Sequence, residues 1–233
     1  MSEIINLFPV SIYKSKISLN DKDKKNMINE ILLMKNESLK KSSTLKADNK
    51  SWTGDVSGYD QICQNPNFSN LFQNIQEHVK KYCELLYIDH EKLDFYFQRS
   101  WATVSTGKEN ISAHRHDQSH LSFAYYLQKN EKDSRIYFLD HSKQNEFIPQ
   151  LFSSASVAKT NLIKERNITN SPRVNITASE DDIVIFPSKT LHGTESNISN
   201  EQRISISADI FCISKDSKYL ENLTPPIKNW KKF

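Results

Sequence analysis

Two kinds of hydrophobic spacing divide the chain near residue 92. Before that point apolar residues recur every three or four positions, which predicts amphipathic helices. We expect one helix over residues 20–35, where Asn20 suits the cap position, and a second over 66–86, where Pro66 suits the first helical turn. The apolar face of the second helix is formed by Leu71, Phe72, Ile75, Val79, Tyr82 and Leu86.

The segments around these helices are less regular. Residues 4–18 contain β-forming side chains around Pro9 and predict a strand. Residues 36–64 are rich in Ser, Lys, Asn and Thr, a composition that is typical of a loop. The helices are therefore expected to stand between a short strand and a long connection.

After residue 92 the period changes from 3.6 to 2, as expected for β-strands. The predicted strands cover residues 93–104, 121–127, 136–139, 182–186 and 204–213. Residues 140–180 are polar, with a weak strand signal at 174–176, and ordered loops of this length are uncommon in a compact domain. We expect this segment to hold short strands or a lid that shapes substrate choice.

This order predicts a mainly β protein, a closed or double-sheet β-core supported by N-terminal α-helices. Two strands leave the nature of the interior open. Residues 203–210 alternate strictly between polar and apolar, and residues 121–127 place Ser122, Ala124 and Tyr126 on one face. The polar face either meets solvent or lines a barrel that holds a charged ligand, and periodicity does not choose between them.

The composition fits a single domain of 233 residues with a modest core, because apolar residues make up 37% and mean hydropathy is −0.64. Within it we expect helical support over 1–91, the β-core over 92–213 and a tail over 214–233. The net charge is only +3, and the basic residues are concentrated only at 228–232. A nucleic-acid partner is therefore not expected.

Cysteine usage and the N-terminus bear on location. Cys63, Cys83 and Cys212 are odd in number and form no CxxC pair, which disfavours a disulfide framework or a zinc ribbon. The first residues lack the basic and apolar regions of a signal peptide, and no stretch is long and apolar enough to span a membrane. We expect a cytoplasmic protein with no membrane partner.

Histidines carry the candidate chemistry. His114 and His116 are two residues apart, so on an extended strand both side chains point to the same side, and His192 follows a later strand. Three ligands on one face leave the other positions of a mononuclear iron open. Arg203 and Ser205 also share a strand face, and an arginine fork matches a carboxylate. The combination indicates an iron site beside a 2-oxo acid, although each motif alone is weak.

These motifs occur in an order that resembles the 2-oxoglutarate- and Fe(II)-dependent oxygenases akin to prolyl hydroxylases. The likeness runs from Asn6-Leu7-Phe8-Pro9 through Ser100-Trp101, His114-Arg115-His116, Leu121-Ser122 with Tyr125-Tyr126, and Phe186-Pro187-Ser188 to His192 and Arg203-Ile204-Ser205. It implies a double-stranded β-helix, or jelly roll, and an enzyme that uses Fe(II), 2-oxoglutarate and O₂.

By this resemblance His114, His116 and His192 are the metal positions, Arg203 and Ser205 hold 2-oxoglutarate, and Tyr126 contacts it too. The sequence departs from the family pattern at Asp117, where proline is usual, and at Phe123, where glycine is usual. The wider superfamily generally has a carboxylate at the position of His116. Asp117 is therefore the alternative middle ligand, although on a regular strand it would point the other way.

Two other functions remain to be weighed. A cupin-like metal enzyme without a 2-oxo acid would suit Gly107, His114, His116 and His120, but the glutamate and the later glycines of that pattern are missing. A binding module without turnover would not need all three ligands. The expected reaction is C–H hydroxylation of a small molecule or peptide with release of succinate and CO₂, and no acid–base residue is required beyond the metal ligands. The sequence does not specify the substrate or the oligomeric state.

Overall fold

The computed structural model describes residues 1–233 except 42–49, 132–134, 154, 156–158 and 220. Its long α-helices include α1 (Asp21–Lys41) and α2 (Ser69–Leu85). Its strands are β1 (Tyr13–Lys16), β2 (Trp52–Thr53), β3 (Leu93–Ser105), β4 (Leu121–Gln128), β5 (Ile136–Leu139), β6 (Arg173–Ile176), β7 (Asp182–Pro187), β8 (His192–Thr194) and β9 (Arg203–Ser214). Short 3₁₀ turns include η1 (Asp55–Ser57), η2 (Ile62–Gln64), η3 (Pro66–Phe68), η4 (His90–Lys92) and η5 (Ile227–Asn229).

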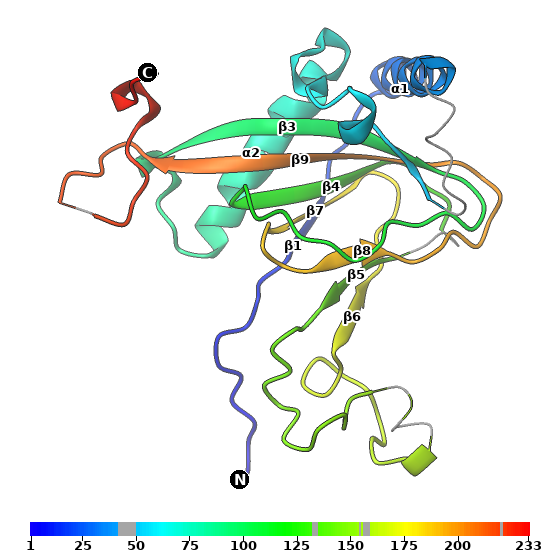
Figure 1. Cartoon of the computed structure of the whole chain (residues 1–233), viewed down its shortest axis with the longest axis vertical. Coiled ribbons are helices and arrows are strands. Elements are labelled where there is room, and N and C mark those ends of the chain that lie inside the picture. Colours follow the sequence, from blue (N-terminus) through cyan, green and yellow to red (C-terminus); the bar gives the residue numbers. More distant parts are fainter. Residues whose placement is uncertain (42–49, 132–134, 154, 156–158, 220) are drawn as a thin grey trace.

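The strands form two antiparallel sheets. The larger has the order β1–β7–β4–β9–β3–β2, and the smaller has the order β6–β5–β8. Strands that are distant in sequence are neighbours in both, as in a jelly roll. In Figure 1 the helices lie with the large sheet in the upper part, and β5 and β6 extend below it. The predicted double-stranded β-helix with N-terminal helical support is confirmed.

The main hydrophobic core lies between the helices and the large sheet. Both helices contribute the apolar faces that their sequences predict, including Met27 and Ile31 from α1 and Phe72 and Ile75 from α2. The opposing strands contribute Phe123, Tyr125, Leu127, Ile204, Ile206, Ala208 and Ile210. These residues alternate with the polar positions of β4 and β9, so the polar face turns away from the helices.

A smaller cluster packs between the sheets and includes Tyr126, Phe138 and Phe186. The polar residues of β9 therefore face an interior, because Arg203 and Asp209 are 1% and 0% exposed. Of the two readings of the strand alternation, the polar interior is the correct one.

A β-bulge in β3 decides which of its side chains enter that interior. The register with β9 shifts between Phe97 and Arg99. Because a one-residue slip moves side chains to the other face, Phe97 packs against Phe72 on the helix side, whereas Arg99 and Trp101 line the interior. The uniform period 2 expected over residues 93–104 missed this switch.

Some boundaries differ from those expected. Strand β1 covers only Tyr13–Lys16 of the predicted 4–18, and the apolar residues before it are largely exposed. Helix α1 runs to Lys41, into the predicted loop 36–64, because Ser38 is still buried and accepts a hydrogen bond from Trp52 Nε1 at 2.8 Å. The remainder of that loop falls partly at 42–49, outside the described residues. Within 140–180 the short strand expected at 174–176 is present as β6.

Candidate functional site: a three-histidine cluster beside a buried arginine

The three predicted metal ligands converge. Ligand atoms of His114, His116 and His192 all lie within 4.8 Å of one another. His114 and His116 belong to no named strand, contrary to expectation. Instead, the backbone of His114 exchanges two hydrogen bonds with His192, at 2.8 and 2.9 Å, and His116 N–H donates to Ser188 O at 3.0 Å. The segment that carries His114 and His116 therefore pairs with β8 and with the residues just before β8, and this pairing brings the two histidines next to His192.

Each ring is oriented by a hydrogen bond at Nδ1. His114 Nδ1 lies 2.9 Å from Ser112 O, and His192 Nδ1 lies 2.8 Å from Thr190 O. Because a carbonyl oxygen only accepts, these contacts place the proton on Nδ1 and leave Nε2 with its lone pair. Partners of this kind orient metal-binding histidines in known sites.

The third ring, His116, has a carboxylate behind it. His116 Nδ1 lies 2.9 Å from Asp209 Oδ1, and Asp209 is fully buried. Burial opposes ionisation of Asp209, but the hydrogen bonds and charges of His116 and Arg99 outweigh it and hold the pKa of Asp209 below its usual value. Arg99 donates to the same carboxylate from Nη2 at 2.6 Å and from Nε at 3.1 Å.

Sequence reasoning did not assign a role to Asp209. The available signal was its place in the alternating run of β9, where it shares a face with Arg203 and Ser205. The structure shows why that face matters: Cα pairing sets Asp209 opposite Ser122 on β4 and Arg99 on β3. Its Oδ1 also accepts a hydrogen bond from Ser122 at 3.2 Å.

The alternative middle ligand, Asp117, lies outside the cluster. Its side chain is 70% exposed and pairs with Arg115 Nε at 2.9 Å. The geometry therefore favours His116 at this position. His120 is also elsewhere: its Nδ1 accepts the Cys212 N–H at 3.0 Å and its ring stacks on Phe211, so it fastens the chain to β9.

Burial keeps two of the cluster histidines neutral. It lowers the pKa of His192 to about 3, and it lowers the pKa of His114 as well. A metal ion binds the neutral imidazole, so a ring that is already deprotonated near pH 7 has no proton to lose. The donor set therefore fits a divalent metal such as Fe(II), which binds well to imidazole.

The expected cosubstrate residues form the other end of the same cavity. Arg203 is 1% exposed and donates from Nη2 to Ser105 Oγ at 3.0 Å and to Thr194 Oγ1 at 3.3 Å. Thr194 is two residues from His192 on β8, which corresponds to about 7 Å along a strand. A short dicarboxylate that reaches from the arginine to the histidines fits this separation.

Tyr126 and Ser205 are neighbours at this end. They are direct Cα partners between β4 and β9, and Thr103 stands opposite Ser205 on β3. Burial raises the pKa of Tyr126 to about 12, and the nearby charge of Arg203 partly opposes that rise. Tyr126 is therefore a neutral phenol beside the guanidinium.

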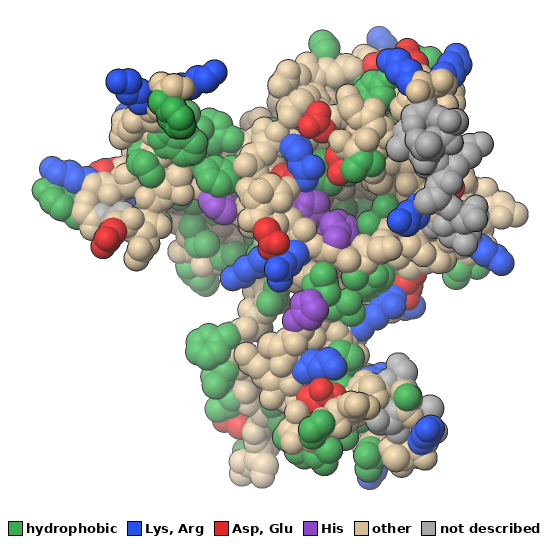
Figure 2. All heavy atoms as spheres, in the orientation of Figure 1, with side chains coloured by type: hydrophobic (Ala, Val, Ile, Leu, Met, Phe, Trp, Pro, Cys, Tyr) green, Lys and Arg blue, Asp and Glu red, His purple; other side chains and the backbone are tan. Residues whose placement is uncertain are grey.

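All six expected site residues line one cavity of about 510 Å³, together with Trp101 and Thr103. Trp101 stacks on His116 with ring centroids 5.7 Å apart. In Figure 2 histidine side chains lie side by side in the middle of this face of the upper part of the molecule. His114 is only partly buried, whereas His116, His192 and Arg203 are buried, so the cavity is reached from the surface at His114.

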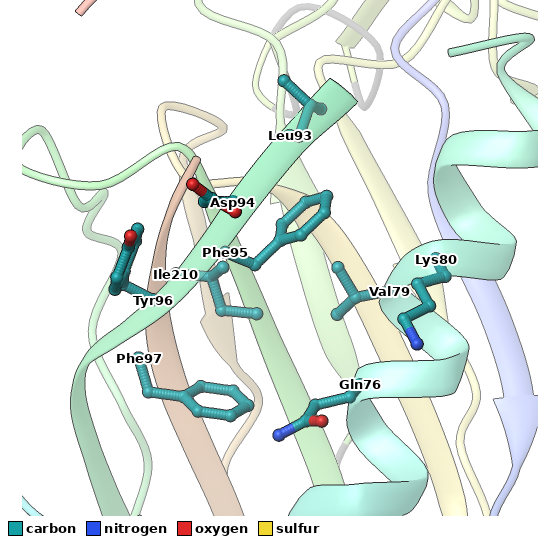
Figure 3. Close-up of a pocket in the computed structure, with 9 residues that line it drawn as sticks. All are labelled: Gln76, Val79, Lys80, Leu93, Asp94, Phe95, Tyr96, Phe97 and Ile210. Atoms are coloured by element: carbon teal, nitrogen blue, oxygen red, sulfur yellow. The ribbon is translucent and has the colours of Figure 1, made fainter. Parts of the chain in front are cut away.

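A second, smaller pocket lies between α2 and the start of β3. Its volume is about 240 Å³, and its walls include Phe95, Phe97 and Val79 (Figure 3). Its charged lining residues are Lys80 and Asp94, and neither belongs to the histidine cluster. This pocket is therefore separate from the cavity that holds the histidines.

A jelly roll that places a three-histidine cluster and a buried arginine in one cavity is an arrangement that suits a metal-dependent oxygenase. The family model described as "Putative 2OG-Fe(II) oxygenase" matches residues 99–209, a range that contains the histidines and Arg203, Ser205 and Asp209. Over residues 99–209, just under half of the chain, the sequence thus matches the 2-oxoglutarate- and Fe(II)-dependent oxygenases, and His114, His116 and His192 form a group that could hold the iron.

Solved structures with the same fold are distant in sequence. The α-ketoglutarate-dependent carbocyclase SnoK from nogalamycin biosynthesis is 13% identical with a TM-score of 0.55, covering 93% of this chain and 87% of its own. HygX from Streptomyces hygroscopicus, solved with nickel and 2-oxoglutarate bound, is 9% identical with a TM-score of 0.51, covering 87% and 83%.

A prolyl-4-hydroxylase from Pseudomonas putida is 10% identical with a TM-score of 0.51, covering 87% of this chain and 92% of its own. No curated protein matched the sequence. At these identities the structures establish the fold alone. Among the helices of the described residues, none has the length and apolar character to cross a membrane.

Proposed function

We propose that His114, His116 and His192 hold Fe(II) through Nε2, and that Arg203, Ser205 and Tyr126 bind 2-oxoglutarate. The enzyme then hydroxylates a C–H bond of a small molecule or peptide and releases succinate and CO₂. The observation that carries the proposal is the presence of a buried arginine and a three-histidine cluster in one cavity.

The chain's own groups prepare the metal end. The backbone carbonyls of Ser112 and Thr190 and the carboxylate of Asp209 fix the three rings with Nε2 free. Bound Fe(II), with 2-oxoglutarate and O₂, supplies the oxidising power that no side chain has. The protein's contribution is orientation, and no acid–base residue is assigned beyond the metal ligands.

At the other end, Arg203 is proposed to bind the far carboxylate of 2-oxoglutarate. A guanidinium presents parallel N–H donors that match a carboxylate, and Ser105 and Thr194 hold it in place. The hydroxyls of Ser205 and Tyr126 lie on neighbouring strands at the same end and add hydrogen bonds. This arrangement distinguishes the enzyme from a cupin that uses no 2-oxo acid.

The test is the absorption of the Fe(II) protein with 2-oxoglutarate under anaerobic conditions. A weak visible charge-transfer band should appear, and air should then produce succinate slowly even without substrate. Arg203→Ala should weaken 2-oxoglutarate binding by roughly 2–5 kcal/mol, as for other buried charge pairs that lose one partner. Arg203→Lys should recover only part of this, because a point charge does not reproduce the fork.

Arg135→Ala is the matched control, since Arg135 is half exposed and pairs with Glu195 on the surface. It should leave the band unchanged. A wild-type protein that binds Fe(II) yet gives neither band nor succinate at any 2-oxoglutarate concentration would refute the oxygenase proposal. The cupin alternative would then be preferred.

We further place the enzyme in a reducing compartment such as the cytoplasm, with no nucleic-acid or membrane partner. Cys63, Cys83 and Cys212 are all free thiols in the structure. Burial raises the pKa of Cys212 to about 12 and raises that of Cys83, so neither is a reactive thiolate. This supports a structural role for both.

A further inference from the structure

One carboxylate oxygen in the cavity wall has no hydrogen-bond partner among the described residues. Oδ1 of Asp55 is buried and makes no hydrogen bond to any of the residues that the structure describes. Asp55 lines the same cavity as His114 and His116. A buried acceptor without a donor is costly, and native proteins rarely keep one without a use.

The backbone holds Asp55 against the cavity by a tight turn. Gly54 links β2 to η1, and its N–H donates to Ala102 O at 2.9 Å. A Cβ atom on Gly54 would stand 2.9 Å from Tyr59 O and 3.4 Å from Ala102 O. Only glycine therefore allows this turn to approach β3 so closely, and the approach brings Asp55 beside Arg99.

Arg99 does not satisfy Asp55. Its Nη1 is 3.8 Å from Asp55 Oδ2, beyond hydrogen-bond distance, whereas its Nε and Nη2 are bonded to Asp209. Two carboxylates thus face one guanidinium in this wall. Besides Arg99, three cations line the cavity: Lys50 is exposed, Arg115 pairs with Asp117, and Arg203 donates to Ser105 and Thr194.

Asp55 is linked to the histidine cluster through the wall of the shared cavity. Arg99, which lies 3.8 Å from Asp55 Oδ2, is bonded to Asp209 at 2.6 Å, and Asp209 contacts His116 Nδ1 at 2.9 Å. A group bound to Asp55 Oδ1 therefore lies near the proposed iron. In an oxygenase this is where the substrate must sit.

We propose that Asp55 is a specificity residue that accepts a hydrogen bond from a protonated amine of the substrate, so that the substrate class is amines. A protonated amine would donate a hydrogen bond to Asp55 Oδ1, and its positive charge would balance the second of the two carboxylates that face Arg99. The proposal rests on the proposed function, since it takes the cavity to be the substrate site.

Methylammonium is a suitable probe, with methanol as its neutral counterpart of similar size. Mn(II) replaces Fe(II) as a paramagnetic ion, and 2-oxoglutarate is present. The relaxation of the methyl protons then reports binding near the metal. Binding of methylammonium should exceed that of methanol, and Asp55→Asn should weaken it about tenfold or more, the expected loss of a charge-assisted hydrogen bond.

Asp117→Asn is the control, because Asp117 is an exposed carboxylate that does not line the cavity. It should bind methylammonium as the wild type does. Thermal unfolding of Asp55→Asn shows whether the variant is folded, and Asp55→Ser provides a second variant if it is not. Equal binding of the two probes, or binding that both Asp55 variants retain, would overturn the proposal.

The same samples separate this result from failure of the proposed function. Water-proton relaxation shows whether Mn(II) binds, and the charge-transfer band of the Fe(II) protein shows whether 2-oxoglutarate binds. If either is missing, the proposed function fails. If both are present and methylammonium shows no preference, only the role of Asp55 is wrong.

Discussion

Replacing Asp209 with asparagine tests whether the carboxylate behind His116 prepares the metal site. In the wild type the neighbours of Asp209 are donors. His116 Nδ1 lies 2.9 Å and Ser122 Oγ 3.2 Å from Oδ1, and Arg99 Nη2 lies 2.6 Å and Gln118 Nε2 2.9 Å from Oδ2. Asparagine has the same shape but replaces one oxygen with an NH₂ group. No orientation of that amide accepts from both sides.

Each orientation has a consequence. With NH₂ toward Arg99 and Gln118, donors face donors, and the guanidinium loses its close partner. With NH₂ toward His116, the amide donates to Nδ1 and moves the ring proton to Nε2, the atom proposed to bind iron. Outer-sphere substitutions of this kind cost about 10–100-fold in metal affinity, or about 1.4–2.7 kcal/mol.

The assay is anaerobic calorimetric titration with Fe(II), paired with urea unfolding of the metal-free protein. Asp182→Asn is the matched control, since Asp182 is a buried carboxylate bound to Lys14, Lys16 and the Ser179 N–H, away from the cavity. It should lose stability and keep its Fe(II) affinity. If Asp209→Asn binds Fe(II) as tightly as the wild type, Asp209 does not orient His116 for the metal.

Much of the fold was predictable because local patterns agreed with the final packing. Helix α2 and strands β4, β5, β7 and β9 appear close to their predicted bounds, and α1 begins where expected, since each shows a clear apolar period. The extension of α1 to Lys41 depends on Ser38 meeting Trp52, a tertiary contact that composition does not reveal. The bulge near Arg99 depends on pairing with β9, which is equally invisible locally.

The candidate site shows the same division. The three histidines and Arg203 were named from spacing and motif order, and the structure brings them to one cavity. Asp209 and Asp55 were not named, because a lone aspartate carries no motif. Asp209 matters because its carboxylate contacts His116 Nδ1, which is far away in the sequence. Asp55 matters because its buried Oδ1 has no hydrogen-bond donor among the described residues. The ligand and cosubstrate assignments themselves stay predictions until they are tested.

Two further predictions concern the strand that carries His192. In Gly193→Ala a Cβ would stand 2.8 Å from Ile111 O and 2.5 Å from Tyr137 Oη, so we expect β8 to shift, a loss of about 1–3 kcal/mol in urea unfolding, and weaker Fe(II) binding. Unchanged stability would contradict this prediction, because it would show that Ile111 and Tyr137 move aside for the added methyl group at no cost in free energy. The second prediction is a pH dependence of the metal-free protein. Burial lowers the pKa of His192 to about 3, whereas the unfolded chain has a histidine pKa near ~6.5. Between these values the unfolded state binds a proton that the folded state does not, so the free energy of unfolding falls as the pH drops from about 6.5 toward about 3. Between pH 7 and pH 5 this amounts to about 2 kcal/mol for the one group. His192→Gln has no such group, so its stability should change less over that range in chelator-treated samples. Parallel curves for the two proteins would mean that His192 is protonated in the folded state as readily as in the unfolded chain.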